Sequence, residues 1–189
     1  MKNLKGRRIT LVPPRKEYAS EMILEANDKA VARFTHMPHP YTQKHFAAFI
    51  KKSSSSHKKN KKKEDYAYLI VSNPEKKLLG GAGLHKINYK DSNAELGYWI
   101  AKSARGQGYA KEAADLLLNF GFNHLNLNRI CLNCLCSNKA SKKVIKKLGA
   151  KYEGIARKKV KINGEYHDEY THSLLKSEYN QLKKTKTKK

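Results

Sequence analysis

Residues 94–113 read AELGYWIAKSARGQGYAKEA, and this stretch combines the patterns of a strand, a turn and a helix. Its first eight residues have the aromatic and branched character of a β-strand, and residues 109–125 repeat apolar side chains at helical spacing. Gly106 and Gly108 lie between the two patterns. Glycine adopts backbone conformations that other residues resist, and the first amides of a helix have no partner inside it. The stretch therefore predicts a strand, a glycine turn and a helix, a junction at which an anion can bind.

Two common nucleotide-binding loops do not fit this turn. A Walker loop ends in Gly-Lys-Ser/Thr, whereas Lys111 is followed by Glu112. A dinucleotide fingerprint needs a third glycine where the chain has Lys111. From the glycines alone, a plain surface turn and an anion site both stay open.

The remaining sequence predicts a mixed α/β chain. Strands are expected at residues 7–12, 66–72, 78–87, 94–101, 129–136, 151–162 and 165–175, and helices at 15–30, 42–52, 109–125 and 138–150. We expect one domain over residues 1–179, followed by a basic tail at 180–189. Residues 51–64 are rich in lysine and serine and are expected to be a mobile insertion.

The formal charge of +24 is extreme for 189 residues. Twelve lysines in residues 51–63 and 183–189 carry half of it, and neither segment contains an acidic residue or is expected to fold. Such a field favours acidic proteins or nucleic acid as partners over polyamine-like cations. No apolar run approaches the roughly 20 residues that cross a bilayer, and no secretory signal is evident, so we expect a cytoplasmic protein without a membrane partner.

The three cysteines lie together in CLNCLC, residues 131–136. A zinc site needs a fourth ligand at matching spacing, and none is evident, so we expect reduced thiols and no metal.

Residues 105–110 (RGQGYA) fit the pattern Arg/Gln-x-x-Gly-x-Gly/Ala, which resembles the acetyl-CoA pyrophosphate loop of the GCN5-related N-acetyltransferase (GNAT) superfamily. Residues 94–113, 138–154 (NKASKKVIKKLGAKYEG) and 163–175 (NGEYHDEYTHSLL) together resemble its RimJ/RimL subgroup, which modifies the N-terminal amines of ribosomal proteins. The resemblance runs from about residue 7 to residue 179, without the insertion.

The resemblance implies a fold and a cofactor site. The expected fold is an α/β GNAT fold: a mixed, mostly antiparallel central sheet of about six to seven strands, flanked by helices, with a splayed strand pair that holds acetyl-CoA. The main chain of Trp99, Ile100 and Ala101 would bind the pantetheine arm, and Asn138 would contact it as well. The pyrophosphate would bind the amides of Arg105, Gly106, Gln107, Gly108, Tyr109 and Ala110.

Two further residues are candidates for catalysis. Transfer of acetyl to an amine needs a base for the amine and a proton donor for the departing thiolate. Glu95 is the candidate base, directly or through water, and Ser141 is the candidate beside the thiolate. The alternatives are that Glu95 pairs with a lysine and that Ser141 faces solvent. His85, His167 and His172 lie in strand patterns, where an imidazole is more often a satisfied polar group than a base.

Three functional hypotheses follow. The first is an acetyl-CoA-dependent N-acetyltransferase acting on the N-terminal amine of a protein, a ribosomal one in the first place, with the basic segments reaching a ribosome or another acidic partner. The second is acetylation of a small amine such as a polyamine or an aminoglycoside. The third, of another class, is a non-catalytic RNA- or ribosome-associated protein whose lysine segments bind. The sequence leaves the acceptor open, as well as the choice between a monomer and a dimer.

Overall fold

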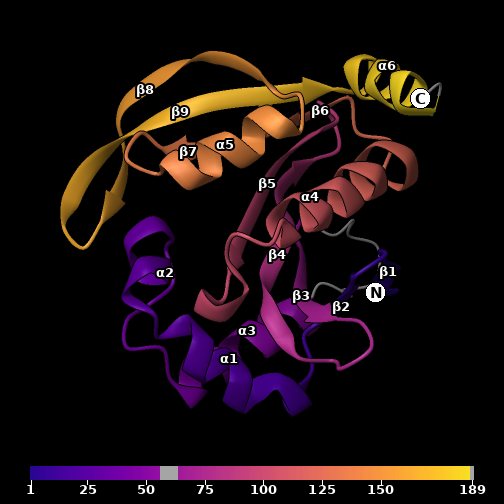
Figure 1. The fold of residues 1–189 in the computed structure, drawn as a ribbon. Helices are drawn as coiled ribbons and strands as arrows, with labels where there is room; N and C mark the ends of the chain where they lie inside the picture. The colour runs from indigo at the N-terminus through magenta and orange to yellow at the C-terminus, as the bar shows by residue number, and fades with distance from the viewer. Residues whose placement is uncertain (56–63, 188–189) are drawn as a thin grey trace.

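The computed structural model describes residues 1–55 and 64–187. Its strands are β1 (Leu4–Lys5), β2 (Ile9–Val12), β3 (Tyr66–Ser72), β4 (Leu78–Asn88), β5 (Asn93–Ile100), β6 (Arg129–Cys131), β7 (Cys134–Leu135), β8 (Lys151–Ile162) and β9 (Glu165–Leu175). Its α-helices are α1 (Ala19–Ala26), α2 (Lys29–Phe34), α3 (Gln43–Ser55), α4 (Tyr109–Asn119), α5 (Lys139–Lys147) and α6 (Lys176–Thr187). Figure 1 shows α1 and α3 at one end of the molecule and the long β8–β9 hairpin at the other.

The described strands form one sheet in the order β1-β2-β3-β4-β5-β6-β9-β7, with β8 also paired to β9. Every pair is antiparallel except β5–β6, which is parallel. This confirms the expected mixed, mostly antiparallel sheet flanked by helices. The sheet has nine described strands instead of six to seven, because β1 adds one and the predicted strand 129–136 is two.

That predicted strand divides at Leu132 and Asn133. The Asn133 side chain takes the place of a backbone acceptor, since its Oδ1 accepts from the N–H of His172 at 3.2 Å. Beyond this point β7 pairs with β9 alone. Asparagine side chains commonly compete in this way with the backbone ladder.

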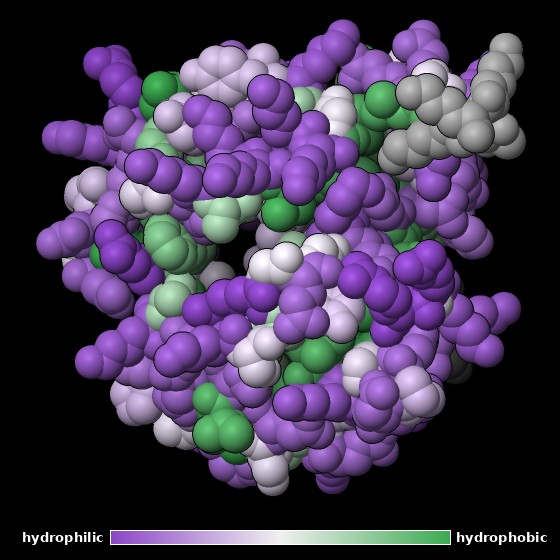
Figure 2. Space-filling model, in the orientation of Figure 1, coloured by the Kyte–Doolittle hydropathy of each residue, from purple (hydrophilic) through white to green (hydrophobic). Residues whose placement is uncertain are grey.

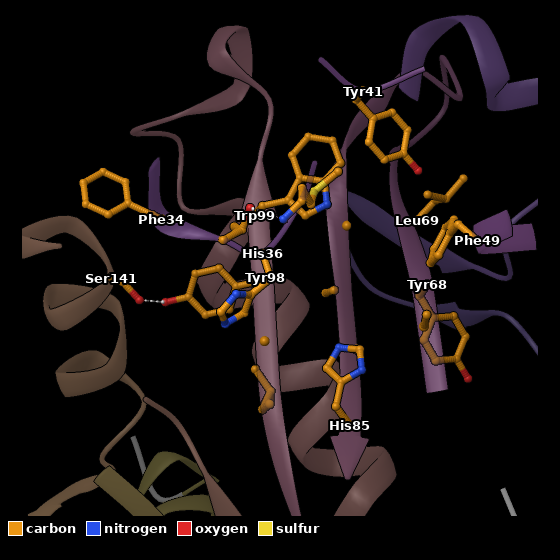
Figure 3. A pocket seen from close by; sticks show the side chains of 18 of the residues that line it. Phe34, His36, Tyr41, Phe49, Tyr68, Leu69, His85, Tyr98, Trp99 and Ser141 are labelled. Atoms are coloured by element: carbon orange, nitrogen blue, oxygen red, sulfur yellow. Dashed lines mark hydrogen bonds between the residues drawn. The ribbon is translucent and has the colours of Figure 1, made fainter. Parts of the chain in front are cut away.

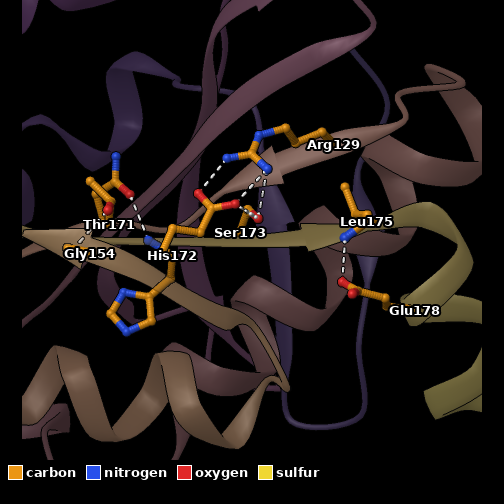
Figure 4. A network of polar contacts seen from close by, with 9 residues as sticks. Arg129, Gly154, Thr171, His172, Ser173, Leu175 and Glu178 are labelled. Carbon is orange, nitrogen blue, oxygen red and sulfur yellow. Dashed lines mark hydrogen bonds and ion pairs between the residues drawn. The ribbon is translucent and has the colours of Figure 1, made fainter.

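The division splays the sheet beside β5. β6 pairs with β5 only over Asn93–Glu95, so residues 96–100 of β5 have no partner on that side among the described strands. Near the end at which β5 and β6 pair, Arg129 ties β6 to β8 and β9, because its Nη1 donates to Glu153 Oε1 at 2.8 Å and to Ser173 Oγ at 2.9 Å (Figure 4). The expected splayed strand pair is therefore confirmed in this fold.

Helices cover both faces of the sheet. Ala113, Ala114, Leu117 and Leu118 of α4 are buried in one hydrophobic cluster, which includes Leu84 and Leu96 of the sheet. The second cluster joins α1 and α3 to the other face; its buried members are Val12, Tyr18, Met22, Ala26, Tyr41, Phe46, Leu69, Val71 and Leu78. The apolar spacing that predicted these helices is thus the spacing of their buried faces.

The helix predicted over residues 15–30 is two helices. Asp28 caps α2, because its Oδ1 accepts from the N–H of Ala30 at 2.7 Å. Asn27 ends α1, and its Nδ2 donates to the carbonyl oxygens of Ile23 and Tyr41, each at 2.8 Å. Side-chain bonds to the backbone at two consecutive positions interrupt the helix that the apolar spacing alone predicted.

Both lysine-rich segments were expected not to fold, and the structure places part of each in a helix. Residues 51–55 belong to α3, and residues 56–63 lie outside the described part of the chain. Residues 180–187 continue α6, which begins before the expected end of the domain at 179. This helix is anchored by Tyr179 and Leu182. The ring centres of Tyr179 and Phe122 lie 5.1 Å apart, and Leu182 lies against Gly149. Two apolar residues thus contribute to docking a helix whose remaining composition is typical of a solvated segment.

In the described residues, none of the helices combines the length and the apolar character that a membrane span requires.

Candidate active site

The glycine turn leads from β5 into α4 as predicted. Gly106 and Gly108 have φ angles of +77° and +84°, a region that residues with a side chain rarely adopt, and Gly108 is the N-cap of α4. The unpaired amides of the first turn of α4 therefore begin directly at the glycine turn.

Arg8 holds this turn from the edge of β2. Its Nη1 donates to the carbonyl oxygen of Gln107 at 2.9 Å, its Nε contacts Glu112 Oε2 at 2.9 Å, and its guanidinium lies 4.8 Å from the Tyr109 ring centre. Burial alone would raise the pKa of Glu112, but the hydrogen bonds from the Arg8 N–H and guanidinium outweigh it and hold that pKa below its ordinary value. Sequence patterns did not reveal Arg8, because it lies 99 residues from Gln107.

Two side chains of the turn fold back onto the protein. Arg105 Nε donates to the carbonyl oxygen of Ile100 at 3.2 Å, and its Nη2 contacts Asp28 Oδ2 at 3.1 Å. Gln107 Nε2 donates to the carbonyl oxygen of Ser103 at 3.0 Å. These contacts tie the turn to β5 and α2.

A cavity of about 460 Å³ opens beside the turn, and we name it the loop cavity. Figure 2 shows a hollow on this face, between α2 and α5. The predicted cofactor residues that line the loop cavity are Trp99, Ile100, Arg105, Gly106, Gly108, Tyr109, Ala110 and Asn138. Its described walls carry basic side chains from the turn, α4 and α5 and no carboxylate; the basic residues are Arg105, Lys111, Lys143 and Lys147.

The structure does not bring Gln107 or Ala101 to the lining of the loop cavity. Ala101 is fully buried, its N–H donates to the carbonyl oxygen of Leu79 at 2.9 Å, and its carbonyl accepts from Ala104. Both backbone groups of Ala101 are thus already paired.

A second cavity, of about 560 Å³, lies over the sheet face that α1 and α3 cover, and we name it the sheet cavity (Figure 3). Three glycines of neighbouring strands, Gly81, Gly83 and Gly97, line it where side chains would otherwise stand. Its other described walls are mostly apolar and aromatic, with three histidines and no aspartate, glutamate, lysine or arginine. The histidines are His36, His45 and His85.

The two cavities share one wall; its residues are Phe34, Thr35, Tyr98, Trp99, Asn138 and Ser141. Tyr98 Oη and Ser141 Oγ lie 3.0 Å apart across the splay between β5 and α5 (Figure 3). Asn138 caps α5, since its Oδ1 accepts from the N–H of Ser141 at 3.0 Å. The predicted Ser141 therefore faces both cavities. Tyr98 had no sequence signal beyond its strand, and only the splay reveals its place.

Tyr98 keeps its proton over the physiological range. Burial raises its pKa to about 12, although the hydrogen bond with Ser141 acts in the opposite direction. The neighbouring Cys134 is a free, buried thiol, and burial raises its pKa to about 11. Around the shared wall, the phenol is thus a proton donor and the thiol is a poor nucleophile.

Glu95, the candidate base, lines neither cavity. Its carboxylate contacts Lys86 Nζ at 3.0 Å, which is the alternative that the sequence left open. Its cross-strand partner on β4 is His85, which does line the sheet cavity.

The other predicted histidines lie away from both cavities. His172 is buried between the rings of Tyr152 and Tyr170, and desolvation lowers its pKa. His167 belongs to β9, opposite Val160 of β8. Within the described residues, no group of three or more metal-ligating side chains could hold a metal ion.

Comparison with known proteins identifies the family of this chain. A family model described as "Acetyltransferase (GNAT) domain" matches residues 8–151. The putative ribosomal N-acetyltransferase YdaF of Bacillus subtilis is 37% identical over 102 residues, which cover 54% of this chain and 56% of that protein. The spermidine N(1)-acetyltransferase of Vibrio cholerae is 31% identical over 110 residues, covering 58% and 64%. The chain thus spans little more than half the length of such curated relatives.

A solved acetyltransferase structure has a similar fold. The structure of RimL, a ribosomal L7/L12 alpha-N-protein acetyltransferase in complex with coenzyme A, superimposes with a TM-score of 0.81 at 18% identity, covering 92% of this chain and 98% of that one. The family match over residues 8–151, the splayed sheet and the glycine turn agree, and this chain belongs to the GNAT acetyltransferase family.

Proposed function

We propose that the protein transfers the acetyl group of acetyl-CoA to the N-terminal α-amine of a protein. The observation that carries this proposal is the meeting of a basic cavity and an apolar one at the Tyr98–Ser141 pair. A thioester entering from the loop cavity and an amine entering from the sheet cavity would meet at this wall.

The loop cavity fits acetyl-CoA. The amides from Gly106 to Ala110, at the N-terminus of α4, supply hydrogen-bond donors and a partial positive charge for the pyrophosphate. Lys143 and Lys147 of α5 add positive charge on the opposite wall. At the splay, no described strand pairs with residues 96–100 of β5, so they offer a backbone edge along which the pantetheine arm can bind.

The chemistry is a direct transfer. The amine nitrogen attacks the thioester carbon, a C–N bond forms and the C–S bond breaks. Ser141 and Tyr98 supply a proton to the departing thiolate, because the phenol is protonated and hydrogen-bonded to the serine hydroxyl. Glu95, which lines neither cavity, stays a prediction as the base.

The sheet cavity favours a protein N-terminus over a polyamine or an aminoglycoside. Those amines carry several positive charges, and the described walls of the sheet cavity offer no carboxylate to pair with them. The net charge of +24 also repels such cations from a distance and attracts an acidic protein. The similarity to a spermidine acetyltransferase makes the polyamine the second candidate.

An acceptor panel tests the proposal. The protein is incubated with acetyl-CoA and with peptides having free N-termini, spermidine or an aminoglycoside, while thiol release is followed and products are located by mass spectrometry. A matched peptide with a blocked N-terminus and an internal lysine separates α-amine from side-chain acetylation. We expect turnover with the free N-terminus alone. The proposal would be contradicted if thiol were released with spermidine only, or if none of the amines led to thiol release.

A further inference from the structure

His85 occupies space that two glycines leave open on the sheet. A Cβ atom on Gly83 would lie 2.8 Å from His85 Nε2, and one on Gly97 would lie 3.9 Å from it. Gly83 and Gly97 are cross-strand partners on β4 and β5. The imidazole therefore lies along the sheet, over this glycine pair, and forms part of the wall of the sheet cavity (Figure 3).

Asp65 orients the ring from the opposite side. Its Oδ1 lies 3.5 Å from His85 Nδ1. The carboxylate is itself held by Lys52 Nζ at 3.2 Å and by the N–H of Lys86 at 3.1 Å. A carboxylate beside Nδ1 favours the tautomer with the proton on that nitrogen, which leaves the Nε2 lone pair free to accept a proton.

The charged groups around His85 favour its neutral form. Desolvation lowers the pKa of His85 and Lys52 of α3 adds to this, while Asp65 before β3 and Glu95 of β5 partly offset both. Glu95 is in turn paired with Lys86 of β4. Burial alone would raise the pKa of Asp65, but the contacts from Lys52 and Lys86 hold it below its ordinary value, so this partner stays ionised.

The ring also faces the same cavity as the proposed reaction centre. His85, Tyr98 and Ser141 all line the sheet cavity, so the imidazole and the hydroxyl pair open onto one space. A water in the cavity can connect Nε2 with an amine that approaches the Tyr98–Ser141 pair.

We propose that His85, oriented by Asp65, is the base that takes the proton from the acceptor ammonium. This inference rests on the proposed function. One ammonium proton passes, through water, to His85 Nε2 and later leaves to solvent. A second proton leaves the nitrogen as the C–N bond forms, and it replaces the proton that the Tyr98–Ser141 pair gives to the departing thiolate. The products are therefore the amide, the free thiol and one released proton.

The test is the pH dependence of kcat/KM for the peptide with a free N-terminus, at saturating acetyl-CoA, from pH 5.5 to 9. We expect the kcat/KM of His85→Gln to be about 100-fold below that of the wild type at pH 7.5. Its pH profile should also lose the acidic limb, which is the decline in kcat/KM as the imidazole becomes protonated. Asp65→Asn removes a group that raises the pKa of His85, so this limb is expected to move to lower pH. A structural role alone would not move the limb.

Glu95→Gln tests the alternative that Glu95 is the base, and we expect this variant to keep the acidic limb of the kcat/KM profile. Loss of the limb in Glu95→Gln, or its persistence in His85→Gln, would overturn the assignment. The acetyl-CoA Kd and the Tm of each variant report its folding, and Asp65→Asn carries the test if His85→Gln does not fold. Failure of the wild-type protein to acetylate any peptide would instead sink the proposed function and this inference together.

Discussion

The loop cavity and the sheet cavity differ in how far apart along the chain their walls lie. Most of the loop cavity comes from residues 98–111 and 138–147, two short and continuous stretches. The sheet cavity draws on α1, α2, the segment before α3, α3 itself, three strands and the region around β7. The first is a local motif with basic walls, and the second is a long-range assembly with aromatic walls.

The glycines that line the two cavities also differ, between a local role and a long-range one. Gly106 and Gly108 are needed for their positive φ angles, a property of the local backbone. No positive φ is found at Gly83 or Gly97, and their lack of a side chain matters because His85 fills the space above them. A glycine in a turn can therefore be interpreted from its neighbours, whereas a glycine in a sheet has to be interpreted from what packs on it.

The largest effect is expected at the glycine turn. Gly108→Glu places a carboxylate in the loop cavity, at φ +84°, where the pyrophosphate is proposed to bind. We expect the Kd of acetyl-CoA, measured by calorimetry, to rise at least about 100-fold. Gly108→Ala is the matched control: its Cβ meets only Arg8 Nη2 at 3.4 Å, so it isolates the backbone strain, about 1 kcal/mol. Equal affinities of Gly108→Glu and the wild type would refute the loop assignment.

The second-largest effect is expected at the Tyr98–Ser141 pair in the shared wall. Tyr98→Phe removes the phenol that contacts Ser141 Oγ at 3.0 Å, and we expect kcat to fall about 30-fold with an unchanged Kd for acetyl-CoA. Since the pKa of Tyr98 is raised to about 12, the wild-type kcat should show no loss from phenol ionisation below pH 10. A kcat within twofold of the wild type would remove Tyr98 from the proton path.

Filling the sheet cavity separates the two cavities. Gly97→Leu places a side chain between His85 and the shared wall, so we expect kcat/KM for the peptide to fall about tenfold while acetyl-CoA binding stays unchanged. Gly97→Ala is the graded control, because its Cβ would make an ordinary contact with the His85 ring at 3.7 Å. A parallel loss of acetyl-CoA affinity in the leucine variant would show that the cavities are not independent.

The smallest effect concerns the Arg8–Glu112 pair beneath the turn. The folded pKa of Glu112 lies below its ordinary value of 4.5, so the pair's stabilisation is present above pH 4.5 and is lost as the pH falls through the folded pKa. Glu112→Gln should therefore lower the free energy of unfolding by about 1 kcal/mol at pH 7, and the difference should shrink below pH 4.5. Urea denaturation at pH 7 and pH 3.5 measures it. A difference that does not change with pH would show that the pair contributes through packing alone.

Several elements could be predicted because their cause is local. β5, the glycine turn and α4 follow from residues 94–119, and the cap of α5 follows from Asn138. The break at Asn27 was missed, since its partner Tyr41 is 14 residues away. The docking of α6 was missed because charge dominates its composition, while Tyr179 and Leu182 anchor it on distant residues.

The strand–turn–helix junction could be predicted from the sequence, because φ preferences and helix-end amides act within a few residues. The family resemblance could be recognised from short motifs. Which side chains meet at this junction depends on contacts between distant parts of the chain. Tyr98 reaches Ser141, 43 residues away, because the sheet splays beside β5. His85 meets Asp65 and faces a cavity because two glycines from different strands are cross-strand partners. Strand register is set by packing across the whole sheet, and no stretch of the chain read alone contains it.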